Sequence, residues 1–171
     1  PLKQRAGSLL RAIFRGSIMG QTLIYFIHIS RLVCWIGGIV FFSFFTAPLI
    51  FKTLDREKAG EVVGAVFPKY YALGYVCGGL AMVTLFLGQL PQTGLKLAFV
   101  SIMLVFSLFA GFGINPRARD LKIKIRSATD REREELQAKF KSLHSLSVQL
   151  NAGVLLVGLV LLWFTAESMV R

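Results

Sequence analysis

Two residues able to do chemistry, His28 and Arg31, stand inside the otherwise apolar stretch YFIHISRLVCWIGG, which covers residues 25–38. An imidazole can bind a metal or carry a proton, whereas an arginine inside hydrocarbon costs about 2.5 kcal/mol or more unless it has a partner. Two placements of Arg31 are open. In the one that we favour, it sits at the boundary of the hydrocarbon core and its side chain extends to water. In the other placement Arg31 is buried and forms an ion pair with Glu167, at the end of the last apolar stretch. Both placements hold together if Arg31 and Glu167 pair at the boundary.

Polar residues also gather where the last apolar stretch begins. His144, Ser147 and Asn151 are spaced i, i+3 and i+7, which places them on one face of a helix, and Asn115 ends the third apolar stretch. We favour a structural interpretation, in which this face clamps the third and fourth stretches together through hydrogen bonds. The functional alternative is a shallow pocket for a ligand, formed by the same four residues.

His28 and His144 are the two histidines of the sequence, and two histidines in a helical membrane protein raise the idea of a haem bound through both. The topology argues against it. In an antiparallel bundle of four spans, the starts of the first and fourth spans face opposite sides of the membrane, so one iron cannot reach both rings. Either histidine alone could hold a haem or a chlorin, but we favour a hydrogen-bonded structural role for each. We therefore predict no cofactor.

The remaining reactive residue types form no recognisable site. Cys34 and Cys77 lie in apolar runs and make no CxxC pair, so the sequence predicts neither a disulfide nor a metal site. We expect both cysteines to be small, buried packing residues. The sequence contains no nucleophile–base–acid set, no phosphate-binding loop and no HExxH motif, so we expect no hydrolytic chemistry.

The elements that position these residues are expected to be helices that cross a membrane. Of the 171 residues, 54% are hydrophobic and 17% are charged, whereas a soluble domain has about 25% charged residues. The apolar residues form four blocks, at about 22–50, 70–90, 95–114 and 148–166, each near the roughly 20 residues that a helix needs to span the hydrocarbon core. Helices are required because an isolated strand would leave its backbone groups unpaired in lipid.

Basic residues predict the orientation of these spans. The loops between the first and second and between the third and fourth spans hold most of the lysines and arginines, so the positive-inside rule puts both loops in the cytoplasm and both termini outside. Lys3, Arg5, Arg11 and Arg15 argue the other way. The net charge of +11 then points to anionic lipid headgroups as partners rather than to nucleic acid. We expect the cytoplasmic (inner) membrane of a bacterium.

The long loop at 115–147 is expected to be partly helical. Its first part, RARDLKIKIR, is dense in positive charge, and its second part, TDREREELQAKFKSLHSL, begins with Thr129 and Glu132 at the spacing of a capping box. This helix could run straight into the fourth span. The charge run is either a solvated segment that only sets the topology, which we favour, or a surface that docks on anionic lipid.

Small residues predict the faces on which the spans pack. Gly74 and Gly78 form a GxxxG pattern in the second span, and Gly38 and Gly111 occupy comparable positions in the first and third. The sequence FPKYY opens the second span, with Pro68 in its first helical turn. The predicted fold class is all-α: a single-domain, integral-membrane, antiparallel four-helix bundle with a cytoplasmic helical extension before the fourth span.

Four segments together resemble a known family. The segments are HISRLVCWIGGIVFFSFFTAPLIF, VFPKYYALG, INPRAR and LHSLSVQLN, and the likeness covers roughly residues 21–164. They are similar to the transmembrane-protein-205-like family, which bacterial sequences carry as a domain of unknown function. The resemblance implies a four-helix integral membrane protein without an established activity. More distantly it implies a relation to copper-resistance membrane proteins and haem-associated membrane enzymes, although this chain has two histidines and four methionines to offer as ligands.

Three functions follow as hypotheses. The first, which we favour, is a non-enzymatic accessory subunit that packs with other membrane proteins or pigments in a larger complex through Phe-rich faces. The second is a small transporter or metal-handling protein, suggested by the polar face of the fourth span. The third is a haem- or porphyrin-binding protein that uses His28 or His144.

Overall fold

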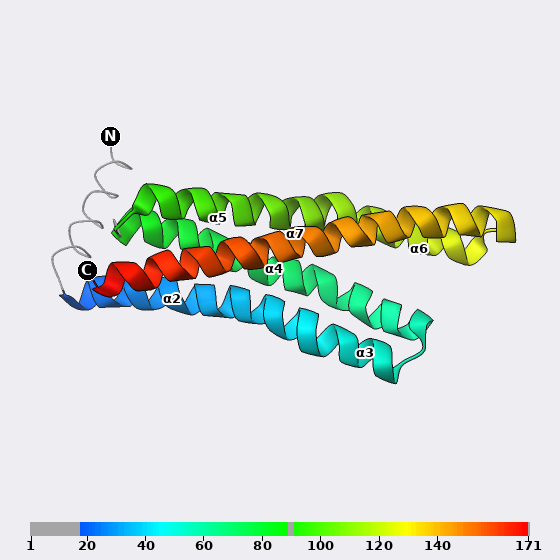
Figure 1. Ribbon diagram of the computed structural model, residues 1–171, viewed down its shortest axis with the longest axis horizontal. Helices are drawn as coiled ribbons and strands as arrows, with labels where there is room; N and C mark the ends of the chain where they lie inside the picture. The colour runs from blue at the N-terminus through cyan, green and yellow to red at the C-terminus, as the bar shows by residue number, and fades with distance from the viewer. Residues whose placement is uncertain (1–17, 89–90, 171) are drawn as a thin grey trace, which may run out of the picture.

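The computed structural model describes residues 18–88 and 91–170, and these residues form four long helical rods. The first rod is α2 (Ile18–Phe41), the π-helix η1 (Phe42–Thr46) and α3 (Ala47–Thr53); the second is α4 (Arg56–Gly88); the third is α5 (Thr93–Leu108), the π-helix η2 (Phe109–Ile114) and α6 (Asn115–Ser127); the fourth is α7 (Asp130–Val170). Each rod is long and apolar enough to cross a membrane. Figure 1 shows the rods side by side, each running in the direction opposite to the one before it. The chain is thus all-helical over the described residues, and its helices suggest a membrane protein.

The four rods are buried along one narrow stripe each. In every rod, four buried positions follow one another at spacings of four, three and four residues, the pattern with which helices of a bundle interlock. These positions are His28, Leu32, Trp35 and Ile39; Gly74, Gly78, Ala81 and Leu85; Lys96, Val100, Met103 and Ser107; Val154, Gly158, Leu161 and Thr165. Large apolar side chains outside the stripes stay exposed, among them Phe112 (70%) and Trp163 (73%), which suits contact with lipid.

The glycines named from the sequence lie where rods approach each other. A Cβ atom at Gly38 would stand 3.3 Å from Leu73, and one at Gly74 would stand 3.0 Å from Trp35. A Cβ at Gly78 would overlap Leu104, and a Cβ at Gly111 would overlap Tyr75. The cysteines behave differently from each other: Cys77 is buried as expected, whereas Cys34 is exposed and does not pack in the interior.

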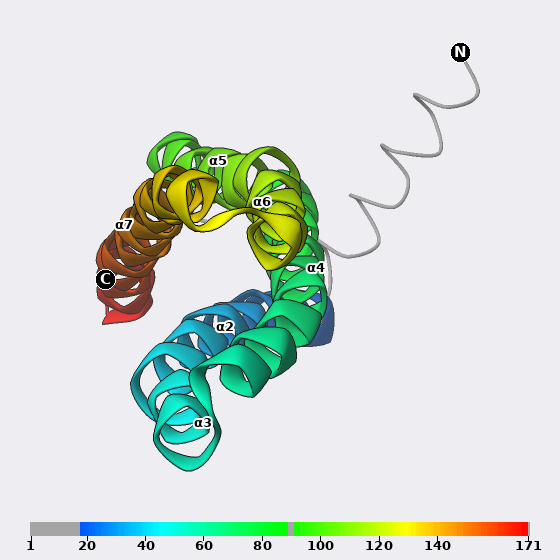
Figure 2. The same ribbon diagram turned by 90° about the vertical axis from the view of Figure 1, so that its right-hand side faces the viewer.

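The first and third rods share one layout. Each passes from an α-helix into a π-helix and then into a second α-helix whose second residue is a proline, Pro48 or Pro116. They differ in length beyond the proline, because α3 ends at Thr53 whereas α6 continues to Ser127. Figure 1 shows that α6 and the start of α7 reach past α3 and the start of α4. Figure 2, viewed from that end of the molecule, shows the rods arranged along an arc.

The second and third rods differ from the sequence expectations in extent. The helix α4 begins at Arg56, not near Tyr70, so Pro68 lies inside it rather than in its first turn. A proline has no N–H to donate, which deprives the carbonyl of Gly64 of its helical hydrogen bond. The basic segment after Asn115 is not a loop, because α6 continues the third rod without a break. The basic residues between positions 3 and 15, which argued against the topology, lie outside the described residues.

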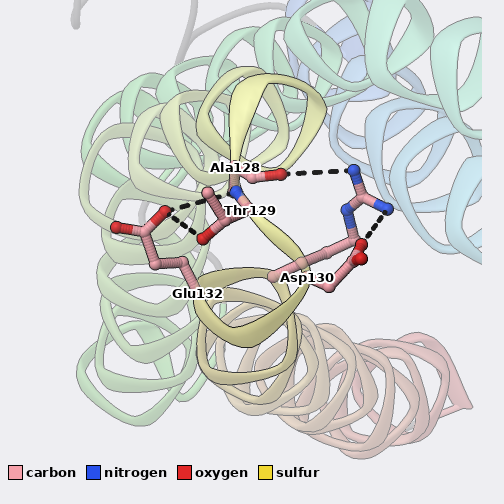
Figure 3. Close-up of polar contacts among 5 residues, drawn as sticks. Ala128, Thr129, Asp130 and Glu132 are labelled. Carbon is pink, nitrogen blue, oxygen red and sulfur yellow. Dashed lines mark hydrogen bonds and ion pairs between the residues drawn. The ribbon is translucent and has the colours of Figure 1, made fainter.

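The helix α7 begins at Asp130 and runs unbroken into the fourth span, as the sequence suggested. Figure 3 shows its first turn, where the carboxylate of Glu132 accepts hydrogen bonds from the Thr129 backbone N–H at 3.2 Å and from its hydroxyl at 2.7 Å. Half of the predicted capping box is therefore present, since Glu132 reaches back to the N-cap residue. The other half differs, because the Thr129 hydroxyl donates to Glu132 instead of accepting from the helix backbone.

Candidate functional site

A cavity of about 680 Å³ opens where α6 and α7 extend beside the first half of α4, and we call it the basic cavity. Its apolar wall consists of aromatic and aliphatic side chains: Phe51, Val63, Phe67, Ile114, Ile123 and Phe140. Its charged lining holds four cations, Arg56, Arg119, Lys122 and Arg126, against the single carboxylate of Glu61. An excess of one charge sign in a cleft with low-dielectric walls attracts ligands of the opposite sign. The basic cavity is therefore suited to an anionic group attached to an apolar body.

Two of these cations fasten α6 to α4. Lys122 donates from Nζ to the carbonyl of Gly60 at 2.6 Å and lies 5.6 Å from the centroid of the Phe140 ring. Arg126 pairs with Glu57 at 3.2 Å and with Glu61. By contrast, Arg56 and Arg119 form no ion pair with another described residue. Their guanidinium groups thus remain available to an incoming anion.

A hydrogen-bonded network lies directly below the basic cavity and joins α4 to α7. Tyr70 donates from its hydroxyl to Asn151 Oδ1 at 3.1 Å, and the hydroxyls of Tyr71 and Ser147 lie 3.1 Å apart. The amide of Asn151 donates to the Ser147 carbonyl at 3.1 Å and approaches the Tyr71 hydroxyl at 3.4 Å. Because Tyr71 and Ser147 also line the basic cavity, this network forms its polar floor.

The four residues of the predicted polar cluster come close together. Asn115, His144 and Ser147 line the basic cavity, and Asn151 lies one helical turn below Ser147 in the floor network. His144 is exposed, and its ring stacks on Phe140 at 6.2 Å between centroids. The hydrogen bonds of Ser147 and Asn151 lead to α4, whereas the sequence suggested a clamp between the third and fourth spans.

Sequence reasoning missed the tyrosines and the basic residues of this site. Tyr70 and Tyr71 were noted only as part of the FPKYY segment that opens the second span, although their hydroxyls bond to the fourth rod. The two tyrosines could have been found because they lie in the second span at the level of the polar face that contains Ser147 and Asn151. The arginines Arg56 and Arg119 were counted only for topology, and their shared cavity depends on how α6 folds against α4.

A second group of polar side chains lies at the other end of the rods, and we call it the buried cationic cluster. Its members are His28, Arg31, Thr84, Lys96 and Ser168. His28 Nδ1 lies 3.0 Å from the Thr84 hydroxyl, and Arg31 Nη2 lies 2.8 and 2.9 Å from the two ring nitrogens of His28. Lys96 donates from Nζ to the Ser168 hydroxyl at 2.9 Å. Arg31 is 3% exposed and Lys96 is 0% exposed.

The position of Arg31 is therefore not the one that we favoured from the sequence. Its guanidinium is buried among helices instead of extending to water, which corresponds to the other placement. Its hydrogen-bond partner is His28; the ion pair with Glu167 stays a prediction. Glu167 itself is half-buried near the end of α7 and has an interaction of its own.

The two histidines belong to these two separate groups. His28 contacts Thr84 of α4, whereas His144 lies one turn from Ser147, which contacts Tyr71 of α4. Thirteen residues separate Tyr71 from Thr84, which corresponds to roughly 20 Å along a helix at about 1.5 Å per residue. One iron cannot bind both rings at this separation. Within the described ranges, no group of three His, Cys, Asp or Glu side chains could hold a metal ion.

Comparison with known proteins places this architecture in a family. Residues 31–127 match the family described as Domain of unknown function (DUF4149). A protein of Aquifex aeolicus (strain VF5), described as an uncharacterized protein, is 36% identical over 119 residues, which are 70% of this chain and 79% of that protein. No solved structure matches this chain.

Proposed function

This chain belongs to the family described as Domain of unknown function (DUF4149), and from that premise we propose that it is a non-enzymatic membrane subunit that holds one anionic lipid by its headgroup in the basic cavity. The single observation that carries the proposal is the composition of the cavity wall. Four cations and one carboxylate line a space of about 680 Å³, and aromatic and aliphatic side chains form an apolar wall beside them. A phosphate group with acyl chains has the same division into a charged end and an apolar end.

The arrangement of the rods in the membrane is part of this proposal. The four rods cross the bilayer as an antiparallel bundle, and the basic cavity lies at the cytoplasmic surface of the inner membrane. Both turns at this end are flanked by lysines and arginines, which are retained in the cytoplasm, so the termini lie outside. Anionic lipids of the facing leaflet attract such a cluster by about 1 kcal/mol for each basic residue near the surface.

The proposed accessory role is based on the exposed aromatic side chains of the bundle. Phe41, Phe44 and Phe45 of the first rod are all more than half exposed, so this rod offers an aromatic face to lipid or to another membrane helix. A subunit with a bound anionic lipid at one end and such a face along its side would join a larger assembly. The link to the transmembrane-protein-205-like family is likewise proposed, on the segments quoted above.

The proposal is tested by the dependence of stability on lipid charge. The purified protein is placed in nanodiscs of phosphatidylglycerol or of phosphatidylcholine, and the midpoint of thermal unfolding is measured. A lipid that binds the folded state raises the midpoint. We expect a higher midpoint in phosphatidylglycerol, and we expect the Arg56→Gln/Arg119→Gln variant to lose most of the difference.

The matched control exchanges two exposed basic residues outside the cavity, Arg131→Gln and Lys141→Gln. It removes the same charge from the same end of the molecule, so the preference for phosphatidylglycerol should persist. If both double variants lost the same share of the difference in midpoint between the two lipids, the result would contradict a specific site. It would leave only a diffuse electrostatic attraction.

A further inference from the structure

The guanidinium of Arg31 is buried with part of its hydrogen-bonding capacity unused. Nη2 approaches the ring of His28, but Nε and Nη1 have no hydrogen-bond partner, although both atoms are removed from solvent. A buried donor without a partner is costly, and a buried unpaired cation more so. The structure therefore contains two donor nitrogens aimed at a place that no described protein acceptor fills.

Lys96 brings a second buried cation to the same place. It is completely buried, and its one hydrogen bond runs to the neutral hydroxyl of Ser168, which itself donates to the Thr165 carbonyl. Lys96 lies about one helical turn from the start of α5, and Thr84, which contacts His28, lies about one turn before the end of the neighbouring α4. Four ion pairs between described residues lie at the other end of the rods, around Asp55, Glu57, Glu61 and Asp130.

His28 cannot supply the missing negative charge. The Thr84 hydroxyl has one proton, which it donates to the carbonyl of Leu80 or Ala81 at 2.9 or 3.0 Å. The Nδ1–H of a neutral His28 then donates to Thr84, and Nε2 accepts from Arg31 at 2.9 Å. This assignment satisfies the ring with no charge, so His28 leaves the charges of Arg31 and Lys96 uncompensated.

We propose that the buried cationic cluster is a binding site for an oxyanion, a carboxylate or a phosphate group, which accepts hydrogen bonds from Nε and Nη1 of Arg31 and neutralises Arg31 and Lys96. Arginine recognises such groups through several N–H donors at once. The site is separate from the basic cavity and does not depend on the function proposed for it.

The location of the cluster fits an anion that enters from the bundle end. Lys96 is the fourth residue of α5, and Thr84 lies four residues before the end of α4. Both positions lie about one helical turn inside the rod ends. In the proposed arrangement this is the depth of the lipid headgroups. The oxyanion comes either from a headgroup of that leaflet or from solution.

The test is made on the full chain carrying Arg56→Gln and Arg119→Gln, so that the basic cavity does not contribute. In one arm, inorganic phosphate is titrated into protein freed of lipid in a neutral detergent, at constant ionic strength, and the unfolding midpoint is followed. In the other arm, the protein is studied without phosphate in phosphatidylglycerol and phosphatidylcholine nanodiscs. A rise with phosphate identifies a free anion, and a rise only with phosphatidylglycerol identifies a headgroup.

In the arm that responds, we expect Arg31→Gln to lower the affinity for the anion about tenfold or more, as loss of a charge-assisted contact does. Arg31→Lys should lower this affinity less. The exposed Arg131→Gln is the control and should respond as the parent does. If Arg31→Gln fails to fold, Lys96→Gln makes the same comparison against Lys141→Gln. No response in either arm, or equal responses in Arg31→Gln and Arg131→Gln, would overturn the proposal.

Discussion

At the residue scale, Thr129 and Glu132 decide where the last helix begins. The Glu132 carboxylate accepts hydrogen bonds from the Thr129 hydroxyl and backbone N–H, and these bonds lower its pKa below the usual 4.5. The residue lies in the polar part of α7, ahead of the apolar stretch. Because the pKa is lower in the folded state, the stabilisation is complete above pH 4.5 and is lost as the pH falls through the depressed value.

We therefore expect the first turn of α7 to loosen in acid. Protection factors for amide hydrogen exchange at residues 133–136, which correct for the intrinsic effect of pH, should fall below pH 4.5 in the parent protein, because the amide of Arg133 is the first to bond within the helix. Glu132→Gln should abolish this pH dependence, whereas Glu134→Gln, an exposed neighbour, should retain it. The same acid response in Glu132→Gln and the parent would show that the cap is not responsible.

Some features of single residues could be predicted from the neighbouring sequence, and others could not. The start of α7 could be predicted because Thr129 and Glu132 are three residues apart and interact within one turn. The burial of Arg31 could not, because it depends on α4 and on the partners of His28. We favoured the boundary because an unpaired charge in hydrocarbon is costly, and that expectation was wrong.

At the element scale, contact between helices depends on single glycines. Gly78 and Gly79 are neighbours in α4, but a Cβ at Gly78 would overlap Leu104, while a Cβ at Gly79 would meet nothing within 4 Å. Gly79→Ala should stabilise the helix by about 0.5–1 kcal/mol through the better helix propensity of alanine. Gly78→Ala should lose about 1–3 kcal/mol through overpacking.

The pair is compared by reversible unfolding in mixed micelles. Because both variants make the same chemical change one position apart, the difference in unfolding free energy reports packing alone. A Gly78→Ala protein as stable as Gly79→Ala would mean that α4 and α5 do not approach as the structure has them.

The existence of the helices could be read from composition, but their lengths could not. Apolar blocks predict where a helix can lie in lipid, and the described residues of all four blocks lie within helical rods. The blocks say nothing about polar continuations, so the start of α4 at Arg56 and the helix α6 were missed. Pro68 was taken as a helix start because proline favours that place, whereas it lies within α4 beside the basic cavity.

At the scale of the whole molecule, the two ends of the bundle carry different chemistry. One end combines an open cavity with exposed arginines, and the other holds buried cations. The candidate polar residues Asn115, His144, Ser147 and Asn151 could be grouped from the sequence because three of them share one helix face. The cavity that Asn115, His144 and Ser147 line could not be predicted, since it exists only when α6 lies beside α4.

The proposed topology predicts which turns face the cell interior. In a Cys34→Ala/Cys77→Ala background, a maleimide that does not cross membranes should label Gln92→Cys on intact cells. It should label Ser127→Cys only after the membrane is permeabilised. The opposite pattern would place the basic cavity at the outer surface.

Native mass spectrometry of the protein released from membranes that contain phosphatidylglycerol and phosphatidylcholine tests the proposed function most directly. The account predicts that one phosphatidylglycerol molecule stays bound to each chain, and that Arg56→Gln/Arg119→Gln releases it while Arg131→Gln/Lys141→Gln does not. Chains that leave the membrane without lipid, or with both lipids in the proportion of the bilayer, would contradict it.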